Sequence, residues 1–154
     1  MTHRFQTFRA VKFAFVAGLI VLAPGLANAE GPVCPVLRGT YAHTFSGTFP
    51  FPGPPAILAP FNGVGVTTFD GAGKVTITET AVFPGNVVSH QGIPGTYTLN
   101  LDCTGTLYSK DPSSANVLQL AFVVADEGKT IYAVGTNKAA PPGTSLTLIY
   151  TKIR

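Results

Sequence analysis

Four side chains have the types and spacing to bind a small molecule or to move a proton. Three of them, Tyr41, His43 and Phe45, are two residues apart, so they share one face of an extended strand. If the two rings point into the protein, the imidazole does too, where it could bind a ligand or act as a general base. The alternative is a histidine that only fills the core or its rim.

The fourth candidate, Glu79, alternates with Val75, Ile77 and Ala81, which places a carboxyl group on the apolar face of a strand. Removal from water favours the neutral form of a carboxyl group, so such a glutamate is a candidate acid or base. The alternative is a register shift near the strand end that brings Glu79 to solvent. We treat these four residues as candidate ligand-binding residues and assign no catalytic residue.

Other polar residues give weaker signals. His90 precedes a glycine-rich bend, so alternation does not show which way it points, and Asp70 is better explained as a turn residue than as a catalytic one. The chain has no nucleophile elbow, Walker loop, zinc-ligand spacing or dinucleotide fingerprint. The sequence therefore predicts no metal and no cofactor, and it disfavours hydrolases, kinases and metalloenzymes. An isomerase, which needs only shape and one or two polar groups, stays open.

These residues lie in a chain that is typical of short strands joined by tight turns. Apolar and polar residues alternate with period two, turn-forming Gly, Pro, Asn and Asp punctuate the intervals, and no window has a sustained helical period. In the fourth strand, Gly92, Pro94 and Gly95 predict a bulge or bend. We predict eight strands, at about 37–49, 57–69, 74–83, 87–99, 103–109, 117–125, 130–136 and 145–153.

Short connections between these strands favour antiparallel neighbours, and eight such strands predict an all-β, up-and-down antiparallel barrel. A two-sheet β-sandwich uses the same strands and is the alternative. Alternation assigns core positions to Leu118, Leu120, Phe122, Val124, Leu146, Leu148 and Tyr150. Alternation also places a set of apolar side chains on the outer face, namely Val117, Ala121, Val123, Ile149 and Ile153. An apolar outer face predicts a covered surface and a candidate homo-oligomer.

A proline-rich segment, residues 49–55, is predicted to be extended and stiff. It could be an aromatic lid at the barrel mouth or a contact for a partner. The alternative, which we favour, is a rigid crossover loop whose prolines prevent edge pairing.

The first 29 residues have the features of a secretory signal. Three basic residues precede an apolar run, and Ala27-Asn28-Ala29 is a cleavage motif. We predict cleavage after Ala29, a single soluble domain at 30–154, no membrane span, and a periplasmic or extracellular location. Seven of the ten basic residues then remain against seven acidic ones, and this balance argues against nucleic-acid binding.

The two cysteines, Cys34 and Cys103, both follow the predicted cleavage point. An even count in an exported chain predicts a structural disulfide. A redox pair would be expected in a Cys-x-x-Cys spacing, which the chain lacks.

The segment Gly95–Thr106 reads G-T-Y-T-L-N-L-D-C-T-G-T. It resembles a group of small, uncharacterised exported bacterial proteins that share a G-T-Y-T-x-N-x-D-C-T-G-T segment, an early cysteine, a G-x-Y strand and an F-D-G-x-G turn. Cys34, Gly39-Thr40-Tyr41 and 69–73 match these last three features, so the resemblance covers most of the chain after the signal. That group is similar to calycin-like barrels of the allene oxide cyclase type, which implies either binding or cyclisation and isomerisation of apolar molecules.

Three functions remain open from the sequence. The first is a barrel without enzymatic activity that binds a small apolar ligand. The second is a cyclase or isomerase, and the third is a structural or interaction module of the cell envelope. The sequence favours the binding protein over the enzyme, and a barrel interior without a cavity would exclude both.

Overall fold

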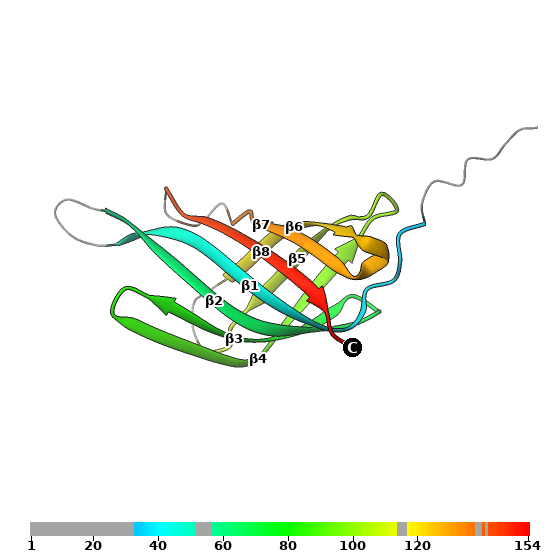
Figure 1. Ribbon diagram of the computed structural model, residues 1–154, viewed down its shortest axis with the longest axis horizontal. Coiled ribbons are helices and arrows are strands. Elements are labelled where there is room, and N and C mark those ends of the chain that lie inside the picture. Colours follow the sequence, from blue (N-terminus) through cyan, green and yellow to red (C-terminus); the bar gives the residue numbers. More distant parts are fainter. Residues whose placement is uncertain (1–32, 52–56, 114–116, 138–139, 141) are drawn as a thin grey trace, which may run out of the picture.

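The computed structural model describes residues 33–51, 57–113, 117–137, 140 and 142–154. Eight antiparallel strands close into a barrel in which each strand pairs with the next and the last returns to the first (Figure 1). The strands are β1 (Arg38–Phe51), β2 (Ile57–Asp70), β3 (Lys74–Phe83), β4 (Asn86–Leu99), β5 (Thr104–Lys110), β6 (Val117–Ala125), β7 (Thr130–Gly135) and β8 (Ser145–Lys152). The predicted up-and-down barrel is confirmed, and the sandwich is excluded.

Some expectations fall on residues that the structure does not describe. The predicted signal segment, 1–29, and residues 52–55 of the proline-rich segment lie outside the described ranges. Within those ranges, no helix has both the length and the hydropathy for crossing a membrane.

The hairpin between β2 and β3 is built on Asp70. Its Oδ1 accepts hydrogen bonds from the backbone N–H groups of Lys74 (2.9 Å) and Ala72 (2.7 Å). These bonds favour the ionised form and lower the pKa of the Asp70 carboxyl group. Gly71 and Gly73 follow with φ of 84° and 98°, which residues with a side chain rarely adopt. The turn role expected for Asp70 is confirmed.

A bulge in β4 decides which residues enter the barrel. The register against β3 shifts so that Ile77 pairs with Ile93 but Glu79 pairs with His90, which leaves two residues of β4 opposite one of β3. Gly92, in the bulge, has a φ of 62°. The extra residue lets both His90 and Ile93 face the interior although they are three positions apart, an arrangement that simple alternation does not predict.

One end of the barrel is closed by tyrosines and by the segment that precedes β1. The hydroxyl of Tyr41 donates a hydrogen bond to the carbonyl of Gly128 (2.6 Å), and that of Tyr97 donates to the carbonyl of Leu37 (2.9 Å). Burial raises the pKa of both tyrosines, so both hydroxyls stay protonated as donors. The ring of Phe69 packs edge-on against both tyrosine rings.

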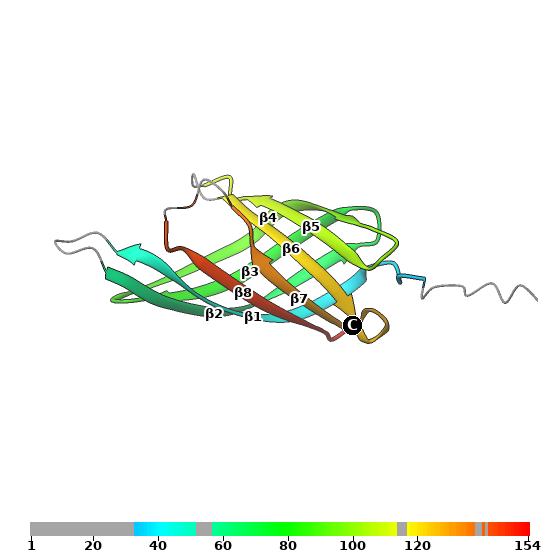
Figure 2. The same ribbon diagram turned by 90° about the horizontal axis from the view of Figure 1, so that it is seen from above.

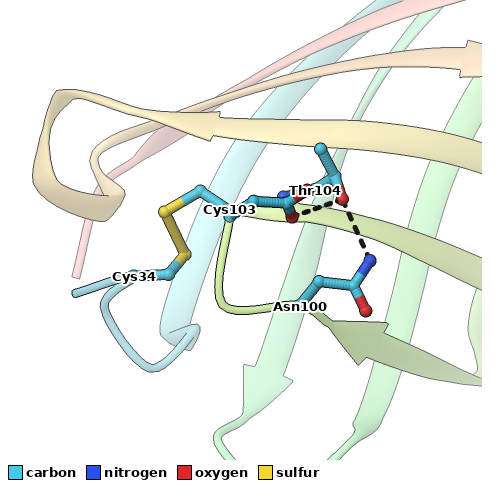
Figure 3. Close-up of a disulfide and its surroundings, with 5 residues drawn as sticks. Cys34, Asn100, Cys103 and Thr104 are labelled. Atoms are coloured by element: carbon cyan, nitrogen blue, oxygen red, sulfur yellow. Dashed lines mark hydrogen bonds between the residues drawn. A yellow bond between two sulfur atoms is a disulfide. The ribbon is translucent and has the colours of Figure 1, made fainter. Parts of the chain in front are cut away.

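The predicted disulfide between Cys34 and Cys103 is present at the closed end (Figure 3). It ties the segment before β1 to the turn that precedes β5. In the same turn, the Asn100 side chain donates a hydrogen bond to Thr104 Oγ1 (2.9 Å), which is drawn beside the bridge in Figure 3. The turn and the bridge together fix the N-terminal segment over the end of the barrel.

The opposite end is open because the strands differ in length. β1 pairs with β2 as far as Phe51, but β8 accompanies β1 only to Thr48. β4 pairs with β5 only over Gly95–Leu99. The β1–β2 and β3–β4 hairpins therefore project beyond the other strands, on the left of Figures 1 and 2.

The predicted core positions face the interior. Five of them are buried, whereas Leu118 and Leu146 are half-buried and line the open end. Val117, expected to point outward, is half-buried and contributes to the rim of the open end, where β6 begins. Leu120, Phe122, Val124, Leu148 and Tyr150 are the buried five.

The outer surface carries the exposed apolar side chains that the sequence predicted at Val123, Ile149 and Ile153. The pairing register places Val123 beside Tyr132 and Tyr132 beside Ile149, so these three form a row across β6, β7 and β8. Ala121, on the same strand, is only partly exposed. Self-association through this face stays a prediction.

Candidate functional site

The open half of the barrel contains a cavity of about 820 Å³. This volume lies in the range of small-molecule sites, which are typically about 300–1,000 Å³. The walls are mostly apolar and are drawn from seven of the eight strands and from the β5–β6 and β7–β8 connections. Their apolar side chains include Phe45, Phe49, Phe61, Phe83, Ile93, Leu118, Leu146 and Leu148.

Small residues on neighbouring strands make room for the rings that wall this cavity. Gly63 of β2 pairs with Ala81 of β3, and a Cβ on Gly63 would collide with the ring of Phe45. Phenyl rings enclose the space: Phe61 and Phe83 stack with centroids 5.4 Å apart, and Phe49 meets Phe83 edge-on at 5.4 Å. Aromatic walls of this kind suit a ligand with a hydrocarbon body.

Two carboxylates and two imidazoles lie in a row beside these apolar walls. The Oε2 of Glu79 is 3.6 Å from Nε2 of His43, and the Oε1 is 3.7 Å from Nδ1 of His90. On its other side, Nε2 of His90 is 3.5 Å from Oδ2 of Asp111. The order is therefore His43, Glu79, His90, Asp111, and each imidazole has a carboxylate within ion-pair distance. We call these four residues the acid–imidazole cluster.

His43 is the most deeply buried member of the cluster, with 3% of its surface exposed. Its Nδ1 is 3.1 Å from the hydroxyl of Thr67, but its Nε2 has no hydrogen-bond partner among the described residues. Gly65 makes space for the ring, because a Cβ there would lie 2.7 Å from Cε1 and Nε2 of His43. The contact with Thr67 and the space at Gly65 thus hold the imidazole ring of His43 with its Nε2 toward Glu79.

Tyr150 lies beside the cluster, with its ring centroid 5.2 Å from that of His43. Burial, with a smaller contribution from the charge of Glu79, raises the pKa of Tyr150 far above its ordinary value. Tyr150 therefore stays neutral next to the cluster.

Asp111 and His90 are the members that the sequence did not assign to a site. Oδ1 of Asp111 accepts hydrogen bonds from the backbone N–H (2.8 Å) and the hydroxyl (2.7 Å) of Ser113, as expected of a turn residue. The Asp-Pro-Ser pattern signalled only that turn. No local sequence pattern predicts that Oδ2 of Asp111 lies near His90, because the two residues are brought together by the pairing of β4 with β5.

Of the four candidate residues from the sequence, the structure brings His43 and Glu79 together, and Phe45 and Glu79 both line the cavity. Glu79 keeps its place on the inner face, and 19% of its side chain is exposed. Tyr41 lies outside the cavity lining. It is fully buried at the closed end, where its hydroxyl binds Gly128.

The fold and the site together define an all-β protein whose closed eight-stranded barrel is packed at one end and hollow at the other. Comparison of the chain with protein-family models, with characterised proteins and with solved structures finds no match. Within the described ranges, no group of three or more His, Cys, Asp or Glu side chains is arranged to hold a metal ion. The chemistry of the site is therefore derived from its apolar walls and the acid–imidazole cluster.

Proposed function

We propose that this protein binds a small, largely apolar molecule in the open half of its barrel. The cavity of about 820 Å³, walled by phenyl and aliphatic side chains, is the observation that carries the proposal. Transfer of a hydrocarbon body from water into such walls is favourable by about 25 cal/mol per Å² of apolar surface buried. The predicted secretory signal and the resemblance to calycin-like exported proteins support a binding protein that works outside the cytoplasm.

The binding proposal is tested with Nile red, an uncharged dye whose fluorescence rises in apolar surroundings. We expect the native protein to bind one dye molecule per barrel. Ala81 lies on the inner face of β3 and lines the cavity, whereas its neighbour Val82 points outward and is exposed. A81W should weaken dye binding by at least about tenfold because the indole occupies part of the cavity and obstructs the dye, and V82W should leave the affinity within about twofold.

Thermal unfolding of both variants, followed by circular dichroism, controls for loss of fold. Equal dye affinities in folded A81W and V82W, or no saturable binding by the native protein, would overturn the proposal.

An isomerase that moves a proton within an apolar substrate is the second candidate function. The observation that favours it is the position of Glu79, a carboxylate in an apolar cavity with an imidazole on either side. Glu79 could take a proton from one carbon of the substrate and return it to another, so that no atom or electron is gained or lost overall.

The isomerase is tested on the compound that native mass spectrometry finds in protein purified from its own host. Incubation of the protein with this compound in D₂O should place deuterium on carbon, and E79Q should lower that exchange at least about 100-fold. A compound recovered without deuterium from the native protein, at a concentration that saturates the cavity, contradicts the enzyme and leaves the binding protein.

A further inference from the structure

The charged groups that line the cavity are both carboxylates in the part of the chain that the structure describes. Glu79 and Asp111 belong to the lining, and no lysine or arginine among the described residues does. The two imidazoles of the cluster, His43 and His90, can each carry at most one positive charge. With the carboxylates ionised, the net charge of these four groups runs from −2 to 0 and never becomes positive.

Glu79 has room for a hydrogen-bond donor from outside the protein. The imidazole nitrogens of His43 and His90, at 3.6 and 3.7 Å, are farther away than a hydrogen bond reaches, and no hydrogen bond joins its carboxylate to any described residue. Its neighbours on the inner face of β3 are the apolar Ile77 and Ala81. An ionised carboxylate in such surroundings is costly unless a donor or a positive charge compensates it.

The imidazole of His43, on the other side of the contact with Glu79, also has a nitrogen without a hydrogen-bond partner among the described residues. Its side chain is 1% exposed, and its Nε2 is a buried polar atom without a hydrogen bond in the described part of the chain. Buried polar atoms in folded proteins are nearly always hydrogen-bonded. This nitrogen faces Glu79, so both unsatisfied groups meet at one place beside the cavity.

We infer that the cavity selects apolar molecules that carry a single protonated amine, with the ammonium group against Glu79. This inference rests on the proposed function, since it names the ligand class of the same cavity. An ammonium group offers three N–H donors and a positive charge to the carboxylate. The phenyl rings of Phe45 and Phe61 line the cavity, where they can hold the hydrocarbon body.

A fatty acid is the opposite case. Its carboxylate would be buried beside Glu79 and Asp111, where the described lining residues offer no net positive charge to offset the repulsion between like charges. An alcohol of the same chain length falls between the two, because its hydroxyl donates one hydrogen bond but carries no charge.

The test compares three ligands with one hydrocarbon chain, namely decylamine, decanol and decanoic acid, by isothermal titration calorimetry at pH 7 and low salt. Decylamine should bind at least about tenfold more tightly than decanol, the difference expected from one charge-assisted hydrogen bond. Decanoic acid should bind more weakly than decanol.

E79Q separates the charge of Glu79 from its size. The variant should lower decylamine affinity by about tenfold or more and change decanol affinity by less than about threefold. E127Q is the matched control, because Glu127 is an exposed glutamate at the closed end and its replacement should change neither affinity.

The outcomes of this test and of the dye experiment are distinguishable. Decanol or decanoic acid binding as tightly as decylamine, or decylamine affinity unchanged in E79Q, would overturn the amine specificity while the cavity still binds Nile red. Failure of all three ligands and of Nile red would remove the binding function itself.

Discussion

Replacing both cysteines, in C34S/C103S, is expected to lower the free energy of unfolding by about 4 kcal/mol. The bridge joins residues 69 positions apart, and closing a loop of that length removes about this much conformational free energy from the unfolded chain in the chain-entropy model. It also holds the segment whose Leu37 is fully buried over the closed end. Urea unfolding at pH 7, with the slope compared between proteins, measures the change.

Two controls accompany this prediction. The native protein in excess reductant should lose the same stability as C34S/C103S, whereas reductant should leave the double variant unchanged. A loss below about 1 kcal/mol in both would mean that the turn around Asn100 and Thr104 holds the N-terminal segment without the bridge.

Removing the ring of Phe122, in F122A, is expected to cost about 3–5 kcal/mol of unfolding free energy. Phe122 is buried on β6, between Gly105 of β5 and Ala133 of β7. Its ring occupies the space that these small residues leave, and a Cβ on Gly105 would collide with it. The two residues paired with it, glycine and alanine, are too small to refill the space, so we expect the variant to keep a void.

F83A is the matched control, because it removes the same ring from the open half. Phe83 is half-buried and forms part of the cavity wall against Phe49 and Phe61. Its removal enlarges an existing cavity instead of creating a void, so we expect a cost of about 1–2 kcal/mol. Urea unfolding compares the two variants. Equal losses would contradict the division of the barrel into a packed half and a hollow half.

The sequence predicted only part of the difference between the packed half and the hollow half of the barrel. Alternation along β6 and β8 identified the residues on the inner face, because successive side chains of a strand point to opposite faces of the sheet. It did not show that Leu118 and Leu146 border a cavity while Leu120 and Leu148 are buried. That difference depends on how far each strand extends relative to its neighbours.

The candidate site was predictable to the extent that its residues obey strand alternation. His43 and Glu79 lie on regular stretches of β1 and β3, and both were placed on the inner face correctly. His90 was not, because the bulge at Gly92 inserts one residue and reverses the facing on one side of it. Tyr41 follows the alternation too, but it lies toward the closed end and away from the cavity.

By itself, the sequence determined an eight-stranded barrel, its turns and its disulfide partners. These features follow from the alternation of side chains, from residues that tolerate turn geometry, and from there being only two cysteines. Only the tertiary structure decided that residues 43, 79, 90 and 111 meet beside one cavity. Their distances depend on the register of four strand pairs and on the unequal lengths of the strands, and these are set by how the whole sheet closes on itself.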